Sequence, residues 1–161
     1  FDGAQRMMAP LGQGELDVGG GTATASLYNS ASRGIGIRIV ADRSRMEAGY
    51  MFQTLMVRKS VMESGRFKDY ADLKGLKFAL VAPGGSPGSA LNEAALKGGV
   101  PYDSIEKVFL PFPAQVSAYA NGAIDASLMI EPFATYLVDQ GVAVRFAAAR
   151  ATPSAVGLRC P

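Results

Sequence analysis

The chain has 161 residues, 48% of them hydrophobic and 19% charged, with a formal net charge of +2. These values indicate a globular protein able to bury a core; the scattered basic residues do not suggest a nucleic-acid surface, and no apolar run approaches membrane-spanning length. The sequence has a single cysteine, Cys160, which excludes an internal disulfide and a cysteine-cluster metal site. It has no histidine, the residue that most often acts as the general base of enzymes.

The first 41 residues favour two helices and two strands. A helix is expected over 4–11, followed by a glycine stop and a short strand within 12–19. The turn Gly19-Gly20-Gly21-Thr22 precedes a second helix over 23–31, which Thr22 could cap. Residues 35–41 alternate in hydropathy, as a strand does.

From residue 52 onward, segments typical of strands alternate with segments typical of helices. Strands are expected at 52–58, 78–82, 108–110, 124–129 and 142–146, with a possible edge strand at 155–158. Helices or helical turns are expected at 61–64, 70–73, between the turn at 83–89 and Lys97, at 113–120, and from Phe133 to about Asp139. Because parallel strands need crossover helices, this alternation predicts an α/β fold with a mostly parallel sheet.

The turn Pro83-Gly84-Gly85-Ser86-Pro87-Gly88-Ser89 lies between a strand and a helix. This arrangement points backbone N–H groups and the positive end of a helix at one spot, which suits a small anion or a polar head group. Ser86 or Ser89 could cap the helix or offer a hydroxyl to the ligand. The turn matches neither the phosphate loop nor the dinucleotide fingerprint. The alternative is a tight turn whose glycines are needed only for steric reasons.

A faint internal repeat relates residues 11–18 to residues 118–126. Both segments read as the end of a helix, then Gly-x-[Leu/Ile]-Asp, then a strand of small residues. The repeat suggests two lobes of similar build.

Five motifs stand in order along the chain: Gly14–Gly19, Asp72–Lys77, the glycine-serine turn, Asn121–Ala126 and Glu131-Pro132. Together they resemble the substrate-binding proteins of ABC importers for nitrate, taurine, alkanesulfonates and thiamine precursors, over Gly3 to about Arg150. The resemblance implies a two-lobed, type II periplasmic-binding fold with a ligand in the interlobe cleft and hinge closure on binding.

The resemblance also implies how the chain is divided. Residues 1–58 would form a partial first lobe, 59–70 the hinge, 71–147 the second lobe, and 148–161 a segment that returns toward the first lobe. Members of the family have a further strand and helix before the position of Phe1 and helices beyond that of Pro161. We therefore expect either a fragment or a partly ordered protein, with the fold incomplete at both ends.

Carried over by position, the family's ligand contacts fall on nine residues. They are Gly20, Gly21 and Thr22 in the first lobe, and Gly85, Ser86, Gly88, Ser89, Gln115 and Glu131 in the second. Glu131 would repel an anion but would suit an amine or a ring N–H; its alternative is a carboxylate turned to solvent or paired with Arg or Lys. For Gln115 the alternative is a solvated helix residue.

The implied function is that of a monomeric solute-binding protein that delivers a small organic anion or heterocycle to the membrane permease of an ABC transporter. Its implied location is the periplasm, or the extracellular side of a membrane to which a segment outside this sequence would anchor it. It would perform no chemistry and need no cofactor, metal or nucleic acid. A sulfonate is the first choice because the loops are rich in donors and hold no dedicated basic residue. The alternatives are the effector domain of a LysR-type regulator, a binding protein for a pyrimidine or thiamine precursor, and a thiamine-pyrimidine synthase, although that activity is associated with histidine and a cysteine-rich motif.

Overall fold

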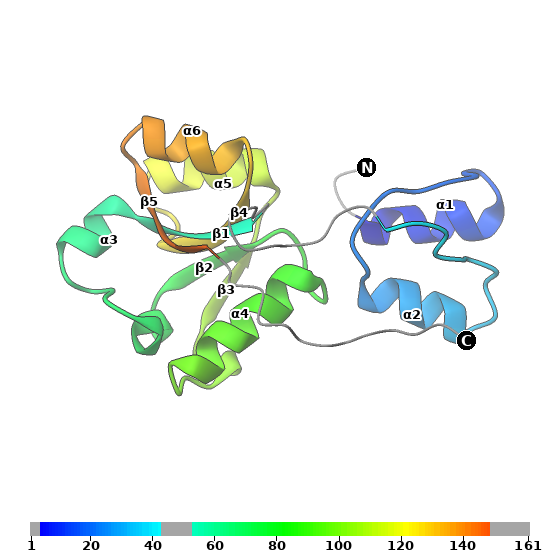
Figure 1. Cartoon of the computed structure of the whole chain (residues 1–161), viewed down its shortest axis with the longest axis horizontal. Helices are drawn as coiled ribbons and strands as arrows, with labels where there is room; N and C mark the ends of the chain where they lie inside the picture. The colour runs from blue at the N-terminus through cyan, green and yellow to red at the C-terminus, as the bar shows by residue number, and fades with distance from the viewer. Residues whose placement is uncertain (1–3, 43–52, 149–161) are drawn as a thin grey trace.

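The structure is a computed structural model that describes residues 4–42 and 53–148. Residues 53–148 form a mixed β-sheet with helices on both faces, which we call the sheet unit, and residues 4–42 form a separate pair of helices, the N-terminal unit (Figure 1). Within these ranges no helix is both long and apolar enough to cross a membrane.

The sheet unit contains every strand that was expected between residues 52 and 146. The strands are β1 (Gln53–Arg58), β2 (Lys77–Leu80), β3 (Glu106–Phe109), β4 (Ala126–Ile130) and β5 (Ala143–Ala148). Its helices are α3 (Lys59–Glu63), η2 (Tyr70–Leu73), α4 (Ser86–Lys97), η3 (Tyr102–Ser104), α5 (Phe112–Ala120) and α6 (Phe133–Asp139).

The strand order is β3-β2-β4-β1-β5. Strands β3, β2 and β4 are parallel, whereas β1 pairs antiparallel with both β4 and β5. The α/β prediction is confirmed, but the sheet is mixed rather than mostly parallel, because β1 runs against its four companions. The glycine-serine turn follows β2 and lies at the carboxyl edge of the parallel strands.

Strand β1 lies inside the sheet, between two other strands. Gln53 pairs with Ile130 of β4, and Arg58 pairs with Ala143 of β5. A strand with ladder partners on both sides belongs to that sheet, so β1 is part of the sheet unit. The expected return segment lies, from residue 149 onward, outside the described residues, as does the possible strand at 155–158.

The core forms two clusters, one on each face of the sheet, because successive strand side chains point to opposite faces. On one face Leu55, Val57, Phe78, Leu80 and Leu128 pack with Leu91 and Ala95 of α4. On the other face Met56, Ala79 and Met129 pack with Tyr119 of α5 and Leu137 of α6. Figure 1 shows the same layers, with α5 and α6 on one side and α4 on the other.

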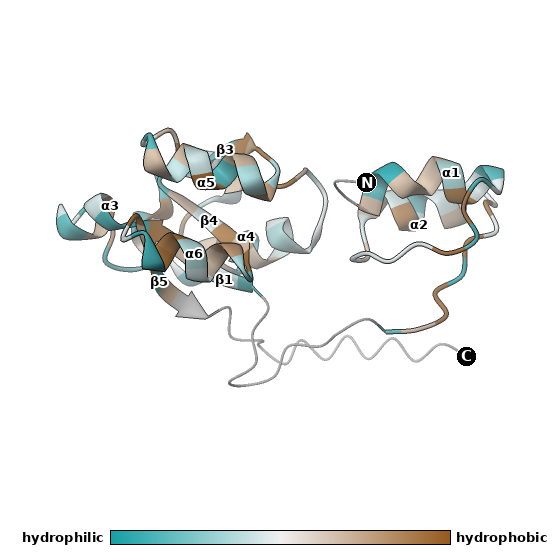
Figure 2. Ribbon diagram, turned by 90° about the horizontal axis from the view of Figure 1, so that it is seen from above, coloured by the Kyte–Doolittle hydropathy of each residue, from teal (hydrophilic) through white to brown (hydrophobic). Residues whose placement is uncertain are grey.

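The N-terminal unit consists of η1 (Ala4–Met7), α1 (Met8–Gln13), α2 (Ala25–Ser32) and coil, and Figure 2 shows it apart from the sheet unit. The strands expected within 12–19 and 35–41 are not formed. Val18, Ile39 and Val40 are 78%, 68% and 84% exposed, respectively. Strands need a neighbour for their backbone groups and apolar side chains, and these segments pair with no strand in the described residues.

Candidate functional site

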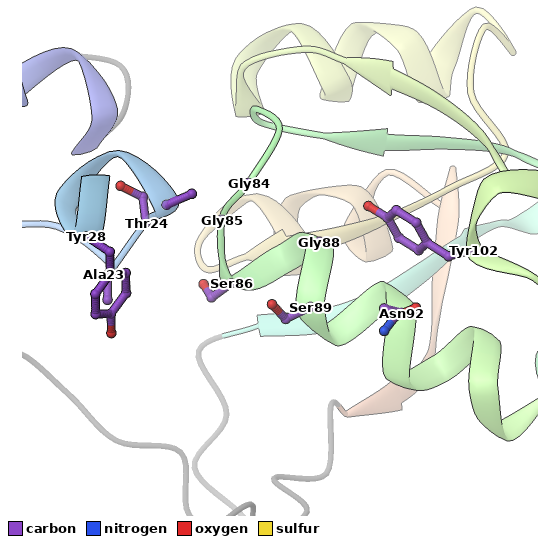
Figure 3. A pocket seen from close by; sticks show the side chains of 11 residues that line it. Ala23, Thr24, Tyr28, Gly84, Gly85, Ser86, Gly88, Ser89, Asn92 and Tyr102 are labelled. Carbon is purple, nitrogen blue, oxygen red and sulfur yellow. The ribbon is translucent and has the colours of Figure 1, made fainter. Parts of the chain in front are cut away.

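A cleft of about 730 Å³ lies where the start of α2 meets the turn that leads into α4 (Figure 3). The N-terminal unit contributes Ala23, Thr24, Ala25 and Tyr28 to its lining. The sheet unit contributes Gly84, Gly85, Ser86, Gly88, Ser89, Asn92 and Tyr102. The cleft is thus built from two segments that are far apart in the sequence.

The wall from the sheet unit is the first turn of α4. Gly84 has a φ of +73°, a left-handed conformation that glycine adopts at little cost, and it turns the chain from β2 into the helix. The N-cap of α4 is Gly85, not Ser86 or Ser89. Because glycine has no side chain, nothing at the N-cap accepts a hydrogen bond from the first amides of the helix. The buried Oγ of Ser86 has no hydrogen-bond partner among the described residues, and Figure 3 shows this hydroxyl on the side facing α2. The start of α4 therefore leaves polar groups available at the cleft.

The opposite wall is the start of α2. Thr24, rather than Thr22, is its N-cap, and the Thr24 Oγ1 accepts a hydrogen bond from the amide of Leu27 at 3.4 Å. The amide of Ala25 donates to the carbonyl oxygen of Gly84 at 3.1 Å. This bond joins the two units directly at the edge of the cleft.

Two helix N-termini therefore meet at one cleft. The N-terminal end of each helix carries about half a positive elementary charge, and the first amides of the helix have no partner within it. The lining residues of the described chain include no charged side chain. An oxyanion fits this arrangement, because partial charges and hydroxyls can hold it without a full counter-charge.

The structure brings together four of the nine expected contact residues. Gly85, Ser86, Gly88 and Ser89 all line the cleft.

Gly20, Gly21 and Thr22 do not line the cleft; the residues that immediately follow them do. A Cβ on Gly21 would lie 2.6 Å from the Cβ of Ala4, so this glycine permits close packing against η1.

Gln115 is fully buried in α5 and lies outside the lining of the cleft. Its Nε2 donates to the carbonyl oxygen of Leu110 at 2.7 Å. Its Oε1 has no partner among the described residues. The side chain thereby fastens the start of α5 to the chain leaving β3, which is a structural contact.

Glu131 also lies outside the lining, and its carboxylate is already engaged. It accepts from the Nη2 of Arg145 at 2.6 Å and from the hydroxyl and amide of Thr135 at 2.8 and 3.1 Å. Partial burial raises the pKa of the Glu131 carboxyl, but the bonds from Thr135 and Arg145 outweigh burial and hold the pKa below its usual value. In this structure Glu131 is thus a carboxylate paired with an arginine, as the alternative interpretation expected.

The cleft includes polar residues that the sequence did not single out: Thr24, Tyr28, Asn92 and Tyr102. Asn92 follows Ser89 by three residues on α4, and residues three apart lie on the same face of a helix. This spacing could have identified Asn92 as a lining residue once Ser89 was selected. Tyr102 follows the end of α4, and only the packing of η3 brings it to the cleft; nothing local in the sequence marks it.

Comparison with known proteins supports the fold. No protein-family model matches the chain, and no curated protein matches its sequence. The alkanesulfonate-binding protein SsuA from Xanthomonas axonopodis pv. citri, bound to MOPS, is similar in structure with a TM-score of 0.75 and 23% identity, over 94% of this chain and 49% of that protein. For the periplasmic aliphatic sulphonate-binding protein SsuA from Escherichia coli the TM-score is 0.63 and the identity 22%, over 90% of this chain and 47% of that protein. For the periplasmic nitrate-binding protein NrtA from Synechocystis PCC 6803 the TM-score is 0.60 and the identity 17%, over 90% of this chain and 41% of that protein.

The chain spans about half the length of these structures. At such identities the likeness concerns the fold, and it confirms at that level the resemblance found in the motifs. The chain has the α/β fold of part of the sulfonate- and nitrate-binding proteins.

Proposed function

We propose that this chain is part of a solute-binding protein that holds a small organic anion, sulfonate-like, in the cleft between α2 and α4. The observation that carries the proposal is the meeting of two helix N-termini at a cleft lined by neutral side chains. A sulfonate offers three oxygen atoms that share one negative charge, which suits several weak donors better than one strong cation does. The lining supplies hydroxyls and amides but no acid–base pair, so the protein binds its ligand without transforming it.

The solved structures support the same direction. One of the similar proteins is an alkanesulfonate-binding protein with a sulfonate, MOPS, bound, and another is a periplasmic nitrate-binding protein. By analogy with them, we infer that this protein acts as a monomer outside the cytoplasm and passes its ligand to the permease of an ABC importer.

Isothermal titration calorimetry tests the binding step. We expect ethanesulfonate to bind and ethylamine, of similar size but opposite charge, to give no binding heat, because both helix N-termini favour an anion. The double variant Ser86→Ala with Ser89→Ala removes two hydroxyls from the cleft and should weaken ethanesulfonate binding about tenfold, the effect of one or two hydrogen bonds.

The matched control is Ser117→Ala, an exposed serine on α5 away from the cleft. It should bind ethanesulfonate as the unmodified chain does. Absence of binding by any small anion would overturn the proposal. Equal affinities in the double variant and in the control would return the glycine-serine turn to a steric role.

A further inference from the structure

The cleft offers little positive charge. The N-termini of α2 and α4 each supply about half an elementary charge, which gives about +1 in total. The lining residues in the described part of the chain, seen in Figure 3, add hydroxyls, an amide and ring surface but no ammonium or guanidinium group. A ligand with one negative charge is therefore balanced, whereas a ligand with two leaves about one charge without compensation.

The basic residues of the two helices lie at the ends away from the cleft. Arg33 is the C-cap of α2, and Lys97 is the last residue of α4. At a rise of about 1.5 Å per residue, they are about 12 and about 16 Å along the axis from the first residues of their helices. These separations exceed the Debye length of about 8 Å at physiological ionic strength, so Arg33 and Lys97 add little to the potential at the cleft.

The other charged side chains beside the lining do not supply the missing charge either. Lys107 contacts the lining residue Tyr102, but its Nζ is engaged there: it donates to the carbonyl oxygen at 2.8 Å and lies 4.2 Å from the centre of the ring. Glu93 of α4 and Asp103 of η3 are acidic and lie outside the lining. Their charges oppose a second negative charge on the ligand.

Hydrogen-bond donors are also limited at this site. The amide of Ala25 is used by the carbonyl oxygen of Gly84, and Pro87 in the first turn of α4 has no N–H. The buried Oγ of Ser86 has no partner within the described residues and remains available. A few donors suffice for one delocalised charge, but the cost of removing an ion from water grows with the square of its charge, to about four times as much for a dianion.

We propose that this cleft selects its ligand by charge: it binds organic oxyanions that carry a single negative charge and rejects dianions of the same shape. The class includes sulfonates and monoesters of sulfate, and it excludes sulfate and the doubly charged form of phosphonates. This inference rests on the proposed function, because it concerns the same anion position between α2 and α4. It adds that charge, rather than the arrangement of three oxygen atoms, decides which oxyanions are excluded.

Two pairs of ligands test the inference by isothermal titration calorimetry at constant ionic strength. Methyl sulfate and sulfate share the tetrahedral oxyanion but carry one and two charges. Ethanesulfonate and ethylphosphonate share the ethyl group, and the phosphonate changes from a monoanion to a dianion when it loses its second proton. We expect ethanesulfonate and methyl sulfate to bind, and sulfate to bind about 100-fold more weakly than methyl sulfate.

The pH dependence separates charge from shape. From about one unit below to about one unit above the second pKa of ethylphosphonate, the singly charged fraction of this ligand falls about tenfold, and its apparent affinity should fall by the same factor. Ethanesulfonate keeps one charge throughout. It should bind equally at both pH values, which controls for titration of the protein.

A variant can supply the missing charge. Ser89→Lys adds an ammonium group to the lining at an exposed position on α4, and it should raise the affinity for sulfate about tenfold more than the affinity for methyl sulfate. The matched control is Ser117→Lys, which adds the same charge at an exposed position on α5 outside the lining. It should leave the ratio of the two affinities unchanged.

The outcomes separate this inference from the proposed function. Sulfate or the phosphonate dianion binding as tightly as its singly charged counterpart overturns the selection by charge and leaves the anion site standing. A ratio that changes equally in Ser89→Lys and Ser117→Lys also overturns it, because the net charge of the protein rather than the cleft would then set the preference. Absence of binding by both ethanesulfonate and methyl sulfate overturns the selection and the anion site together.

Discussion

The two halves of the internal repeat show where local sequence determines structure and where it does not. In the N-terminal unit α1 ends at Gln13, directly before Gly14, and in the sheet unit α5 ends at Ala120, two residues before Gly122; both glycines have a φ of +74°. The hydrogen bonds that close the two helices are the same. The amides of Glu15 and Leu16 bond to the carbonyl of Pro10, and those of Ala123 and Ile124 bond to the carbonyl of Ala118. A short motif thus produces the same helix stop twice.

Beyond the helix stop, the two copies diverge. Ile124 is fully buried and Asp125 nearly so, and β4 follows directly. Leu16 is only half-buried, Asp17 is exposed, and coil follows. The difference lies in the neighbours: β4 has β2 and β1 beside it, whereas the segment after Asp17 pairs with no strand in the described residues. A helix stop is a local event, but a strand exists only through its partners.

The largest expected effect tests this comparison in the core. Ile124→Ala should lower the free energy of unfolding by about 4 kcal/mol, because it removes a fully buried side chain and leaves a cavity among the residues of α5 and α6. The matched change in the other copy, Leu16→Ala, should cost less than about 1 kcal/mol, because that side chain is only partly buried. Urea denaturation measures both. Equal losses would show that the N-terminal unit is as tightly packed as the sheet unit.

The next largest effect concerns the aspartate of the repeat. Asp125 accepts from the Nη2 of Arg58 at 2.6 Å and from the amide of Lys77 at 3.1 Å, so it joins the end of β1 to the start of β2. Its side chain is 8% exposed and that of Arg58 is 23% exposed. Asp125→Ala would leave a largely buried guanidinium unpaired and should cost about 3 kcal/mol, at the lower end for buried pairs because Arg58 still reaches water.

Asp17→Ala is the control for that variant. Asp17 is exposed, so its loss should change the unfolding free energy by no more than about 0.5 kcal/mol. Urea titrations of both variants provide the measurement. A loss below about 1 kcal/mol for Asp125→Ala would mean that the ion pair merely offsets its own desolvation.

The same distinction explains what the sequence could predict of the fold. The strands and helices after residue 52 were predictable because their periodicity, their glycine stops and their prolines in first helical turns agree with the final packing. The segment at 35–41 has the same alternating pattern and remains coil, because alternation shows only that a strand is compatible with the sequence. The position of β1 could not be predicted either. Its direction depends on the partners on both sides, which no local pattern specifies.

The candidate site divides in the same way. The glycine-serine turn was predictable because a strand, a glycine turn and a helix are consecutive in the sequence and build one wall of the cleft by themselves. Thr24 and Tyr102 were missed because each reaches the cleft through a different segment. Glu131 was selected by its position in a motif, yet its partner Arg145 is 14 residues away in β5, and only the folded sheet brings the two together.

The smallest expected effect tests whether exposed polar contacts contribute to the difference in stability between the sheet unit and the N-terminal unit. The bonds of Glu131 with Arg145 and Thr135 fasten α6 to β5, and the two charged side chains are 44% and 41% exposed. Because water screens such a pair, Glu131→Gln should cost only about 0.5 kcal/mol at neutral pH. The pKa of the Glu131 carboxyl is lowered in the folded chain. The ionised carboxylate therefore adds to the free energy of unfolding above the ordinary pKa of about 4.3, and this stabilisation is lost as the pH falls through the folded pKa.

The unfolding free energies of the variant and of the unmodified chain should therefore converge in acid, where the Glu131 carboxyl is protonated and neutral, as the amide is. Glu63→Gln is the control. It removes an exposed ion pair in which the Nζ of Lys59 lies 3.8 Å from the Glu63 carboxylate, and it should cost at most about 0.3 kcal/mol. A deficit in Glu131→Gln that persists unchanged in acid would assign the effect to the shape of the side chain rather than to its charge. The sheet unit would then owe its stability to buried contacts alone, and the contrast with the N-terminal unit would be one of packing.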